Sequence, residues 1–404
     1  MSPTTARRAA AWLLAAGLCA YIVIATRDWH LPTEGGVSFP PTWALVVALG
    51  LLVWWWRVGR PTPATVMAVA AVTGMLLTDV TSFWSQGLRD WHLYLKAGEH
   101  LLGGQPVYLD TLFTRRPDDL TNYPFLYPPP TLPVFALLSL PPRILADVAW
   151  LAFSIGAAAW AFRRLGVGWR WMLVFLVWPP FEQGIYVGNV AIPLFALFVA
   201  APILGAGLVV SAVFKLYNGV AVLWLPRERH WRDLAIGVGL VAAWALVTLP
   251  FVGIDRWAEW IRSLGLYRES QALLPGSLVG MGLARIVPDW AAIALGLLVV
   301  VLALRARGEE GLWRLGVATV IAAPSLYSHG YVMAVPAILR LRTAVLWLVL
   351  GITSVEPGFQ WFVALGIVIA SWYIPALRRE SQPGGAGDVT PIDDDRLHPV
   401  RAAA

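Results

Sequence analysis

Asp90 has the side chain best placed to do chemistry. It opens segment 89–102, in which the apolar positions 91, 94, 95, 97, 101 and 102 form one face of a short amphipathic helix at the membrane interface. A carboxylate that is partly desolvated near the bilayer surface gains basicity and can act as a general base. Asp is also a favoured N-cap residue, so capping of the helix is the competing interpretation.

A second group of polar residues is suited to holding a phosphate. His329 lies in the short turn 327–330, which we place on the same side of the membrane as Asp90. The loop 254–276 adds Arg256, Arg262 and Arg268, and guanidinium groups bind phosphate in a fork geometry. Any of these arginines could instead be simply solvated.

Two further polar positions interrupt apolar runs. The segment 182–189 ends at Asn189, and a polar group at membrane depth must find a partner or face a cavity. Lys215 stands inside another apolar run, and we expect its side chain to snorkel to the cytoplasmic face.

The composition predicts an integral membrane protein. Of 404 residues, 58% are hydrophobic and 13% are charged, whereas a soluble domain has about 45–50% apolar and about 25% charged residues. The net charge of +6 comes from arginines at the ends of apolar runs, which argues against nucleic-acid binding. Lys96 and Lys215 are the only lysines, and the single cysteine, Cys19, excludes an intramolecular disulfide.

Apolar runs divide the chain into hydrophobic segments, from which we expect 11 to 13 crossings in an all-α, polytopic transmembrane bundle. Prolines at 128–130, 141–142 and 179–180 should break some segments between 127 and 206. The segments are about 9–26, 42–56, 63–83, 127–141, 144–162, 170–181, 187–206, 208–226, 233–253, 289–306, 313–328, 331–341, 343–355 and 359–377.

Arginine bias predicts the orientation. Counting alternate crossings puts most arginine-bearing turns on the cytoplasmic side, and Arg163 and Arg164 join them only if one flanking segment does not cross. The loops 84–126 and 254–276 and the turn 327–330 then lie outside the cytoplasm. We expect one membrane domain over 1–380 and a disordered cytoplasmic tail over 381–404.

Several catalytic signatures are missing from the sequence. It contains no phosphate-cradling Gly-Lys-Ser/Thr loop, no His-Glu-x-x-His and no serine nucleophile elbow. No Asp-x-Asp pair stands beside Asp90, which weakens the case for a metal-dependent nucleotide-sugar enzyme. We therefore predict no metal ligands and no cofactor, while a need for a divalent metal stays open.

Seven short motifs follow one another between residues 65 and 345. They are Asp90-Trp91-x-x-Tyr94, Gly104-Gln105-Pro106-Val107-Tyr108, Tyr127-Pro128-Pro129, Val187-Gly188-Asn189, Phe214-Lys215, Pro275-Gly276-Ser277-Leu278 with Arg285, and Ala323-Pro324-Ser325-Leu326-Tyr327-Ser328-His329. Each motif is weak alone, and the ordered set is more specific. Their order resembles the polyprenyl-phosphate-sugar glycosyltransferases of family 87.

The sequence also departs from the family pattern. A glutamine expected near Asn189 is missing or shifted, Gly276 replaces a polar amide residue, and Tyr327 replaces a tryptophan. The two spans before residue 60 are additional. These differences concern the donor and acceptor contacts rather than the class.

The resemblance implies a GT-C architecture with its site in a cavity at the outer leaflet of the cell membrane. It implies transfer of mannose from polyprenyl-phosphate-mannose to an envelope glycolipid or glycan, by an inverting displacement that gives an α-mannoside. Asp90 would be the general base and His329 would bind the donor phosphate. Arg268, Tyr94, Asn189 and Ser277 would contact the donor phosphate or substrates.

Two alternatives remain open at the level of sequence. A relative within the class would transfer arabinofuranose from the corresponding polyprenyl phosphate, because pocket contacts decide the sugar. A lipid-linked-saccharide transporter or flippase is a different class, and it should show paired repeats and ionisable groups at the membrane midplane.

Overall fold

The computed structural model describes residues 3–26, 50, 62–82, 87–108, 124–272, 282–283, 287–323, 327–355 and 358–379, with only the backbone at 3–4, 79–82 and 268–272. Within these ranges the chain is helical and has no strand, only an isolated bridge between Leu341 and Arg378. The predicted all-α bundle is therefore confirmed. Nearly all of the predicted span 42–56, as well as Ser277 and the tail 381–404, lies outside the described residues.

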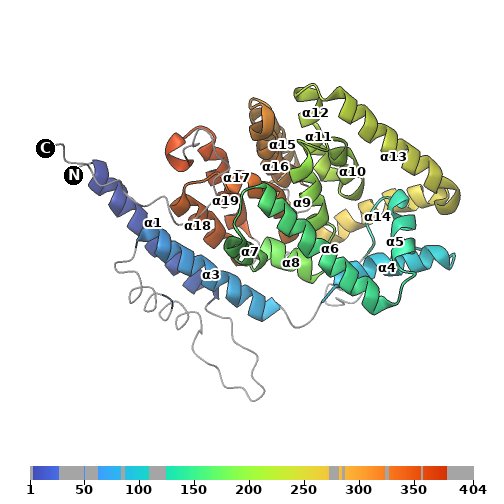
Figure 1. Cartoon of the computed structure of the whole chain (residues 1–404), viewed down its shortest axis with the longest axis horizontal. Helices are drawn as coiled ribbons and strands as arrows, with labels where there is room; N and C mark the ends of the chain where they lie inside the picture. The colour runs from blue at the N-terminus through green and yellow to red at the C-terminus, as the bar shows by residue number, and fades with distance from the viewer. Residues whose placement is uncertain are drawn as a thin grey trace, which may run out of the picture.

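Figure 1 shows how the described helices are arranged. In chain order they are α1 Pro3–Thr26, α3 Pro63–Ser82, α4 Arg89–Leu102, η2 Pro129–Thr131, α5 Leu132–Leu138, α6 Arg143–Arg164, α7 Trp169–Leu176, α8 Pro179–Tyr186, α9 Ala191–Ala200, α10 Ala206–Phe214, η3 Leu216–Asn218, α11 Gly219–Val222, α12 Trp224–Arg227, α13 Trp231–Val252, α14 Asp255–Ala272, α15 Asp289–Ala303, α16 Gly308–Ala322, η5 Ser328–Ala334, α17 Val335–Ile338, α18 Thr343–Ile352, α19 Phe359–Ser371 and η6 Pro375–Leu377.

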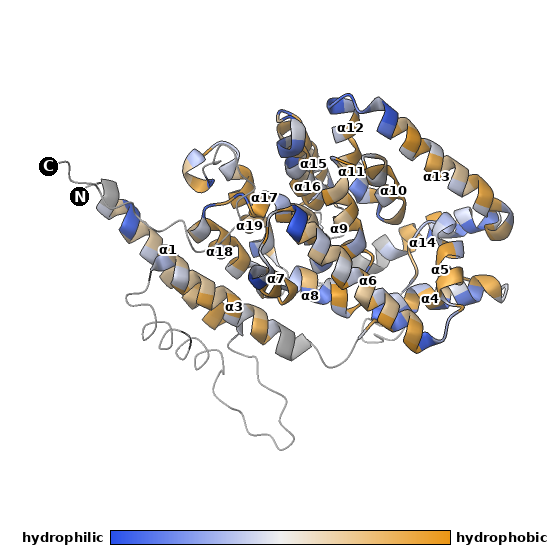
Figure 2. Cartoon of the chain, viewed as in Figure 1, coloured by the Kyte–Doolittle hydropathy of each residue, from blue (hydrophilic) through white to orange (hydrophobic). Residues whose placement is uncertain are grey.

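Three helices in the described part of the chain are long and apolar enough to cross a bilayer: Thr5–Thr26, Arg143–Arg164 and Trp231–Val252. Hydrophobic residues run along all three and along α3 (Figure 2). Many of their apolar side chains are exposed, among them Leu13 at 73% and Leu246 at 68%. Such a surface suits lipid rather than water, so the chain is a membrane protein.

Prolines shorten the helices between residues 127 and 206, as predicted. Pro129 opens the turn η2, and Pro141 and Pro142 separate α5 from α6. Pro179 begins α8, which has only eight residues. A proline lacks the N–H that a helix interior needs, so the chain restarts at each of these points and can turn polar segments toward the interior of the bundle.

Helix α6 connects the two ends of the molecule. Its 22 residues span about 33 Å, close to the thickness of a bilayer's hydrocarbon core. Near its start, Asp147 pairs with His92 of α4 at 3.1 Å, and at its other end Arg164 lies 3.6 Å from Glu309. The segment that contains Asp90 and the arginine-bearing turns therefore lie at opposite ends.

The arginine-bearing end is tied together by one carboxylate. Glu310 accepts from Arg314 at 2.8 Å, from Arg340 at 2.7 Å and from Arg378 at 2.8 Å. Burial by itself would raise the pKa of Glu310, but the hydrogen bond from Arg314 and the charges of Arg340 and Arg378 outweigh it and hold that pKa below its usual range. This cluster fastens the end of the described chain to α16 and α17.

We expect E310Q to destabilise the protein by about 1–3 kcal/mol, since it removes the charge that three guanidinium groups share. Thermal unfolding in detergent measures the effect. The matched control is E309Q, because Glu309 is exposed and, among the described residues, has only the longer contact with Arg164; its effect should stay within about 0.5 kcal/mol.

The same variant has a pH signature. The pKa of Glu310 is lower in the folded than in the unfolded state. The carboxylate therefore makes its full contribution to the free energy of unfolding above its unfolded pKa of about 4.3, and this contribution is lost as the pH falls through its folded pKa. The difference in the free energy of unfolding between wild type and E310Q should therefore disappear only at acidic pH. Equal stability of the two at pH 7 would contradict this role.

Candidate active site

The turn between α8 and α9 docks the first residues of α4. The backbone N–H groups of Asp90 and Trp91 donate to the carbonyl of Val187 at 2.8 and 3.2 Å, and the N–H of Leu88 donates to Tyr186 at 2.7 Å. These are N–H groups that a helix leaves unpaired at its start. The carbonyls of a turn distant in the sequence therefore accept the hydrogen bonds that a capping side chain would otherwise accept.

The interpretation of Asp90 as a helix cap is consequently wrong. The N-cap position is Leu88, at φ 54°, and no side chain caps the helix. The carboxylate of Asp90 instead accepts from Arg89 Nε at 2.9 Å and from Asn189 Nδ2 at 2.6 Å. It is thus available for chemistry, held between a cation and an amide.

Asn189 is oriented by three hydrogen bonds. Its Oδ1 accepts from the backbone N–H of Ala191 at 2.9 Å, which fixes the amide so that Nδ2 faces α4. Nδ2 then donates both to Asp90 and, at 3.0 Å, to the hydroxyl of Tyr94. Gly188 precedes it at φ +70°, where a Cβ would lie 2.6 Å from Cβ of Trp91, so only glycine allows α4 to approach this closely.

A pair of tyrosines extends this network. The hydroxyls of Tyr94 and Tyr127 lie 2.8 Å apart, and Tyr108 donates to the carbonyl of Tyr127 at 2.7 Å. Because one proton suffices for the bond between the two hydroxyls, the pair retains a second O–H that can donate to another acceptor. A sugar hydroxyl oxygen is such an acceptor.

Helix α6 clamps α4 from the side. The rings of Trp91 and Trp150 stack at 4.3 Å, and Trp91 Nε1 donates to Asp147 at 3.0 Å. Trp150 in turn donates to the carbonyl of Gly188 at 2.9 Å. Three elements, α4, α6 and the α8–α9 turn, therefore meet at the residue next to Asp90.

His329 lies in η5, is 3% exposed, and stacks on Tyr327 with ring centroids 5.5 Å apart. Burial and then the charges of Lys215 and Arg89 hold the pKa of His329 well below its usual range, so the imidazole is neutral at neutral pH. Its Nδ1 is buried without a hydrogen-bond partner among the described residues. A neutral ring with a spare nitrogen can bind a ligand by a hydrogen bond but not by charge.

The position of Lys215 contradicts the prediction that its side chain snorkels to the cytoplasmic face. Helix α10 ends at Phe214, and Lys215 occupies its extended C-cap position at φ −135°. The ammonium group lies 5.6 Å from the centroid of the Tyr217 ring and interacts electrostatically with Asp90 and His329. The break in the helix therefore turns the side chain toward Asp90, not toward the arginine-bearing end as a continuous helix would allow.

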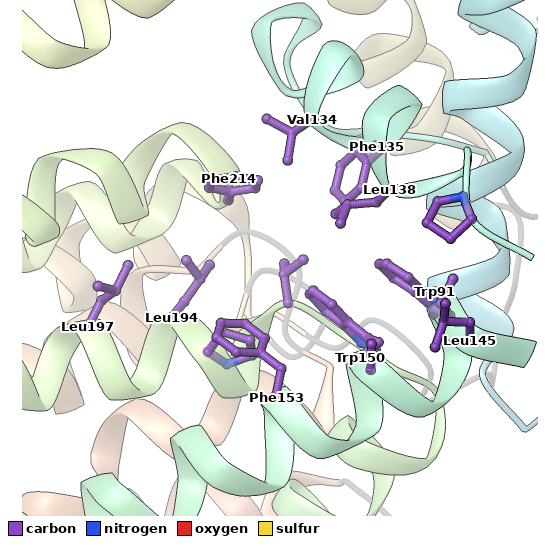
Figure 3. Close-up of a pocket in the computed structure, with 15 residues that line it drawn as sticks. Trp91, Val134, Phe135, Leu138, Leu145, Trp150, Phe153, Leu194, Leu197 and Phe214 are labelled. Atoms are coloured by element: carbon purple, nitrogen blue, oxygen red, sulfur yellow. The ribbon is translucent and has the colours of Figure 1, made fainter. Parts of the chain in front are cut away.

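The described residues also line an apolar cavity of about 670 Å³ (Figure 3). Trp91, Val190 and Phe214, the chain neighbours of Asp90, Asn189 and Lys215, form part of its wall. The other lining residues come mainly from α5, α6 and α9: Val134, Phe135, Leu138, Pro141, Leu145, Ala146, Ala149, Trp150, Phe153, Pro193, Leu194 and Leu197. The arrangement suits an amphiphile with a long apolar chain and a polar end.

The sequence model of glycosyltransferase family 87 matches residues 125–326, half of the chain. The chain belongs to this family. It is therefore a membrane glycosyltransferase, which confirms the resemblance seen in its motifs. No curated protein and no solved structure gives a match.

The family 87 segment contains Asn189 and Lys215 but begins after Asp90 and ends just before His329. Folding brings these outlying residues to the matched core, because Asn189 bonds directly to Asp90. Arg89 and Lys215 both interact electrostatically with His329. The membrane glycosyltransferase thus gathers residues 240 positions apart in one polar cluster.

Among the predicted site residues, Asp90, Tyr94 and Asn189 contact one another, and His329 shares their cluster through Arg89 and Lys215. Ser277 and the side chain of Arg268 lie outside the described part of the family 87 chain. Sequence reasoning missed Arg89 and did not assign Lys215 to the site. A charged residue inside an apolar run was the available signal for Lys215.

Replacing Gly188 tests how α4 is held. In G188A the new methyl group would clash with Trp91, and the alanine would have a strained positive φ. We therefore expect the free energy of unfolding to fall by about 1–3 kcal/mol, measured by thermal unfolding. G156A on α6 is the control, since a Cβ there meets nothing within 4 Å; it should be neutral or stabilising by up to about 1 kcal/mol. A G188A protein as stable as wild type would refute this docking.

Proposed function

We propose that this membrane glycosyltransferase moves a mannosyl residue from polyprenyl-phosphate-mannose to a glycolipid or glycan acceptor of the cell envelope. The observation that carries the proposal is the carboxylate of Asp90, oriented by Asn189 and Arg89, on a helix whose next residue, Trp91, lines an apolar cavity. An enzyme that uses a lipid-linked sugar needs such a pairing of a polar reacting centre with room for an apolar chain.

In the proposed reaction Asp90 is the general base. As the acceptor hydroxyl oxygen forms its bond to the anomeric carbon, its proton passes to the carboxylate of Asp90. The bond between the anomeric carbon and the phosphate oxygen breaks, and its electron pair leaves with the polyprenyl phosphate. Attack from the face opposite the phosphate inverts the configuration, so a β-linked donor yields an α-mannoside.

The cavity supports a lipid-linked rather than a nucleotide-linked donor. Its wall consists of aliphatic and aromatic side chains, which favour an isoprenoid chain through burial of apolar surface. Phe135, which lines the cavity, packs against the rings of Tyr94 and Tyr127, so the sugar would lie near this tyrosine pair, and His329 would hydrogen-bond the phosphate. No cofactor has a role in this scheme.

The transporter alternative fits less well. Transporters hold ionisable groups near the membrane midplane at an interface between repeats. Here Asp90 and Arg89 lie on α4, at the end where α6 begins. Transfer of arabinofuranose is the second candidate, because no contact among the described residues separates the two sugars.

We further propose a multi-pass location in the cell membrane with the site on the extracytoplasmic side. The two ends that α6 joins support this: arginine-bearing turns gather at one end, around Glu309 and Glu310, and Asp90 lies at the other. Residues 1–380 would form the catalytic membrane domain.

Asp90 is tested by D90N. Loss of the base should lower the transfer rate by about 10²–10⁴-fold while the thermal unfolding temperature stays close to that of wild type. E99Q is the matched control, because Glu99 is exposed on the same helix, and it should retain full activity. A D90N protein that folds and transfers sugar at the wild-type rate would rule out Asp90 as the base.

The donor is identified with purified protein and crude envelope lipid. Polyprenyl-phosphate-mannose should support transfer, polyprenyl-phosphate-arabinose should not, and GDP-mannose should be inert as a direct donor. Repeating the assay in EDTA tests for a divalent metal. Transfer from GDP-mannose by the pure protein would contradict the mechanism, and preference for the arabinose donor would replace mannose with arabinofuranose.

The cavity is tested by A149W, which places an indole in the space lined by α5, α6 and α9. We expect the KM for a long-chain donor to rise about tenfold or more, with a smaller effect on a donor that has a short chain, since only the long chain needs the whole cavity. A152W, on the exposed surface of α6 outside the cavity, is the control. Equal KM values for A149W and A152W would disprove the lipid-chain site.

A further inference from the structure

The carboxylate of Glu310, at the arginine-bearing end, is surrounded by more positive charge than it can neutralise. Arg314, Arg340 and Arg378 each donate to it, at 2.8, 2.7 and 2.8 Å. A guanidinium group is always charged in a protein, and the lowered pKa of Glu310 keeps its carboxylate ionised at neutral pH. Three positive charges and one negative charge leave a net charge of +2, and no second carboxylate among the described residues lies within 4.0 Å of these arginines.

Two of the three guanidinium groups also keep hydrogen-bond donors that Glu310 does not use. Only Nη1 of Arg340 and Nη2 of Arg378 bond to it, whereas a guanidinium group carries five N–H donors. These two side chains are 41% and 28% exposed. The third, Arg314, is 12% exposed and lies 5.0 Å from the centroid of the Trp372 ring. Arg340 and Arg378 can therefore present their remaining N–H groups to a phosphate, which suits their fork geometry.

The space between these side chains is a small hollow. Its volume is about 10 Å³, and the indoles of Trp313 and Trp372 form part of its wall. That is room for about one water molecule, so a larger ligand would rest on the outer edges of Arg340 and Arg378. Such a shallow site suits the head group of a molecule that is anchored elsewhere, as a lipid is by its chains.

The cluster lies just beyond the end of an apolar helix. Helix α19 ends at Ser371, and its apolar side chains include the exposed Phe359 and Val363. Tyr373 and Ile374 follow it, both exposed, and Arg378 comes shortly after them. Exposed aromatic residues between an apolar helix and arginines are typical of the surface of a bilayer. The guanidinium groups are thus placed where lipid head groups lie.

We propose that Arg340 and Arg378 bind the phosphate of an anionic phospholipid at the arginine-bearing end of the protein. The phosphodiester supplies negative charge that the cluster lacks, and the lipid chains lie along the apolar surface of α19. A lipid that binds the folded protein and not the unfolded chain also stabilises the fold. The inference is independent of the transfer reaction. A free phosphate ion has the same charge chemistry but no chains to hold it at so shallow a site.

Native mass spectrometry of the full chain in detergent measures this binding without any sugar transfer. Phosphatidylglycerol should bind with a dissociation constant about fivefold or more below that of phosphatidylcholine with the same chains, because the choline cancels the charge of the phosphate. R378Q should weaken the binding of phosphatidylglycerol about fivefold, since one charge near the head group is lost. R305Q is the control: Arg305 is exposed in the turn before α16 but lies outside the cluster, and this variant should match wild type.

E310Q separates lipid binding from support of the fold. It removes the carboxylate that the three arginines share, so the protein in detergent loses stability, but it raises the net charge of the cluster to +3. Phosphatidylglycerol should therefore bind E310Q about fivefold more tightly than it binds wild type. It should also raise the thermal unfolding temperature of E310Q more than that of wild type. A cluster that only supports the fold would show neither gain.

Four results would contradict the proposal. Equal affinity of wild type and E310Q for phosphatidylglycerol would show that the charge of the cluster is not read by the lipid. Equal weakening by R305Q and R378Q would show that the arginines act only through the overall charge of that end. Displacement of the lipid by millimolar inorganic phosphate would identify a free phosphate ion as the ligand. Equal binding of phosphatidylcholine and phosphatidylglycerol would show that the chains alone bind.

Discussion

The docking of α4 on the turn between α8 and α9 is the constraint on which the candidate site depends. Two N–H groups at the start of α4 share the carbonyl of Val187, and the glycine that follows Val187 lets the helices touch. Asn189 comes next in the chain, so the same turn that receives the helix also presents an amide to Asp90. Position and orientation of the carboxylate thus have one physical origin.

The surrounding fold supplies two environments around that point. Aromatic rings and aliphatic side chains enclose an apolar cavity, and the charges of Arg89 and Lys215 act on His329. Broken helices make this possible, because each short helix ends inside the bundle and exposes a turn or a cap residue there. Continuous spans would have offered only their side chains to such a site.

The two ends of the molecule are held by different physics. At the arginine-bearing end, one carboxylate joins three guanidinium groups and fixes α16, α17 and the residues after α19. At the other end, the pairs of Arg89 with Asp90 and of His92 with Asp147 lie beside stacked rings, those of Trp91 and Trp150.

The sequence by itself determined that the protein is a helical membrane protein whose helices break at prolines. It also identified Asp90 as a candidate catalytic residue, because these features follow from composition and from residue spacing along the chain. It also carried the family motifs. Tertiary structure alone decided that Asp90 does not cap its helix, since the carbonyl of Val187, some hundred residues away, satisfies those N–H groups. It likewise turned Lys215 toward Asp90, because a side chain's direction depends on where its helix breaks and what packs around it, and neither follows from hydropathy.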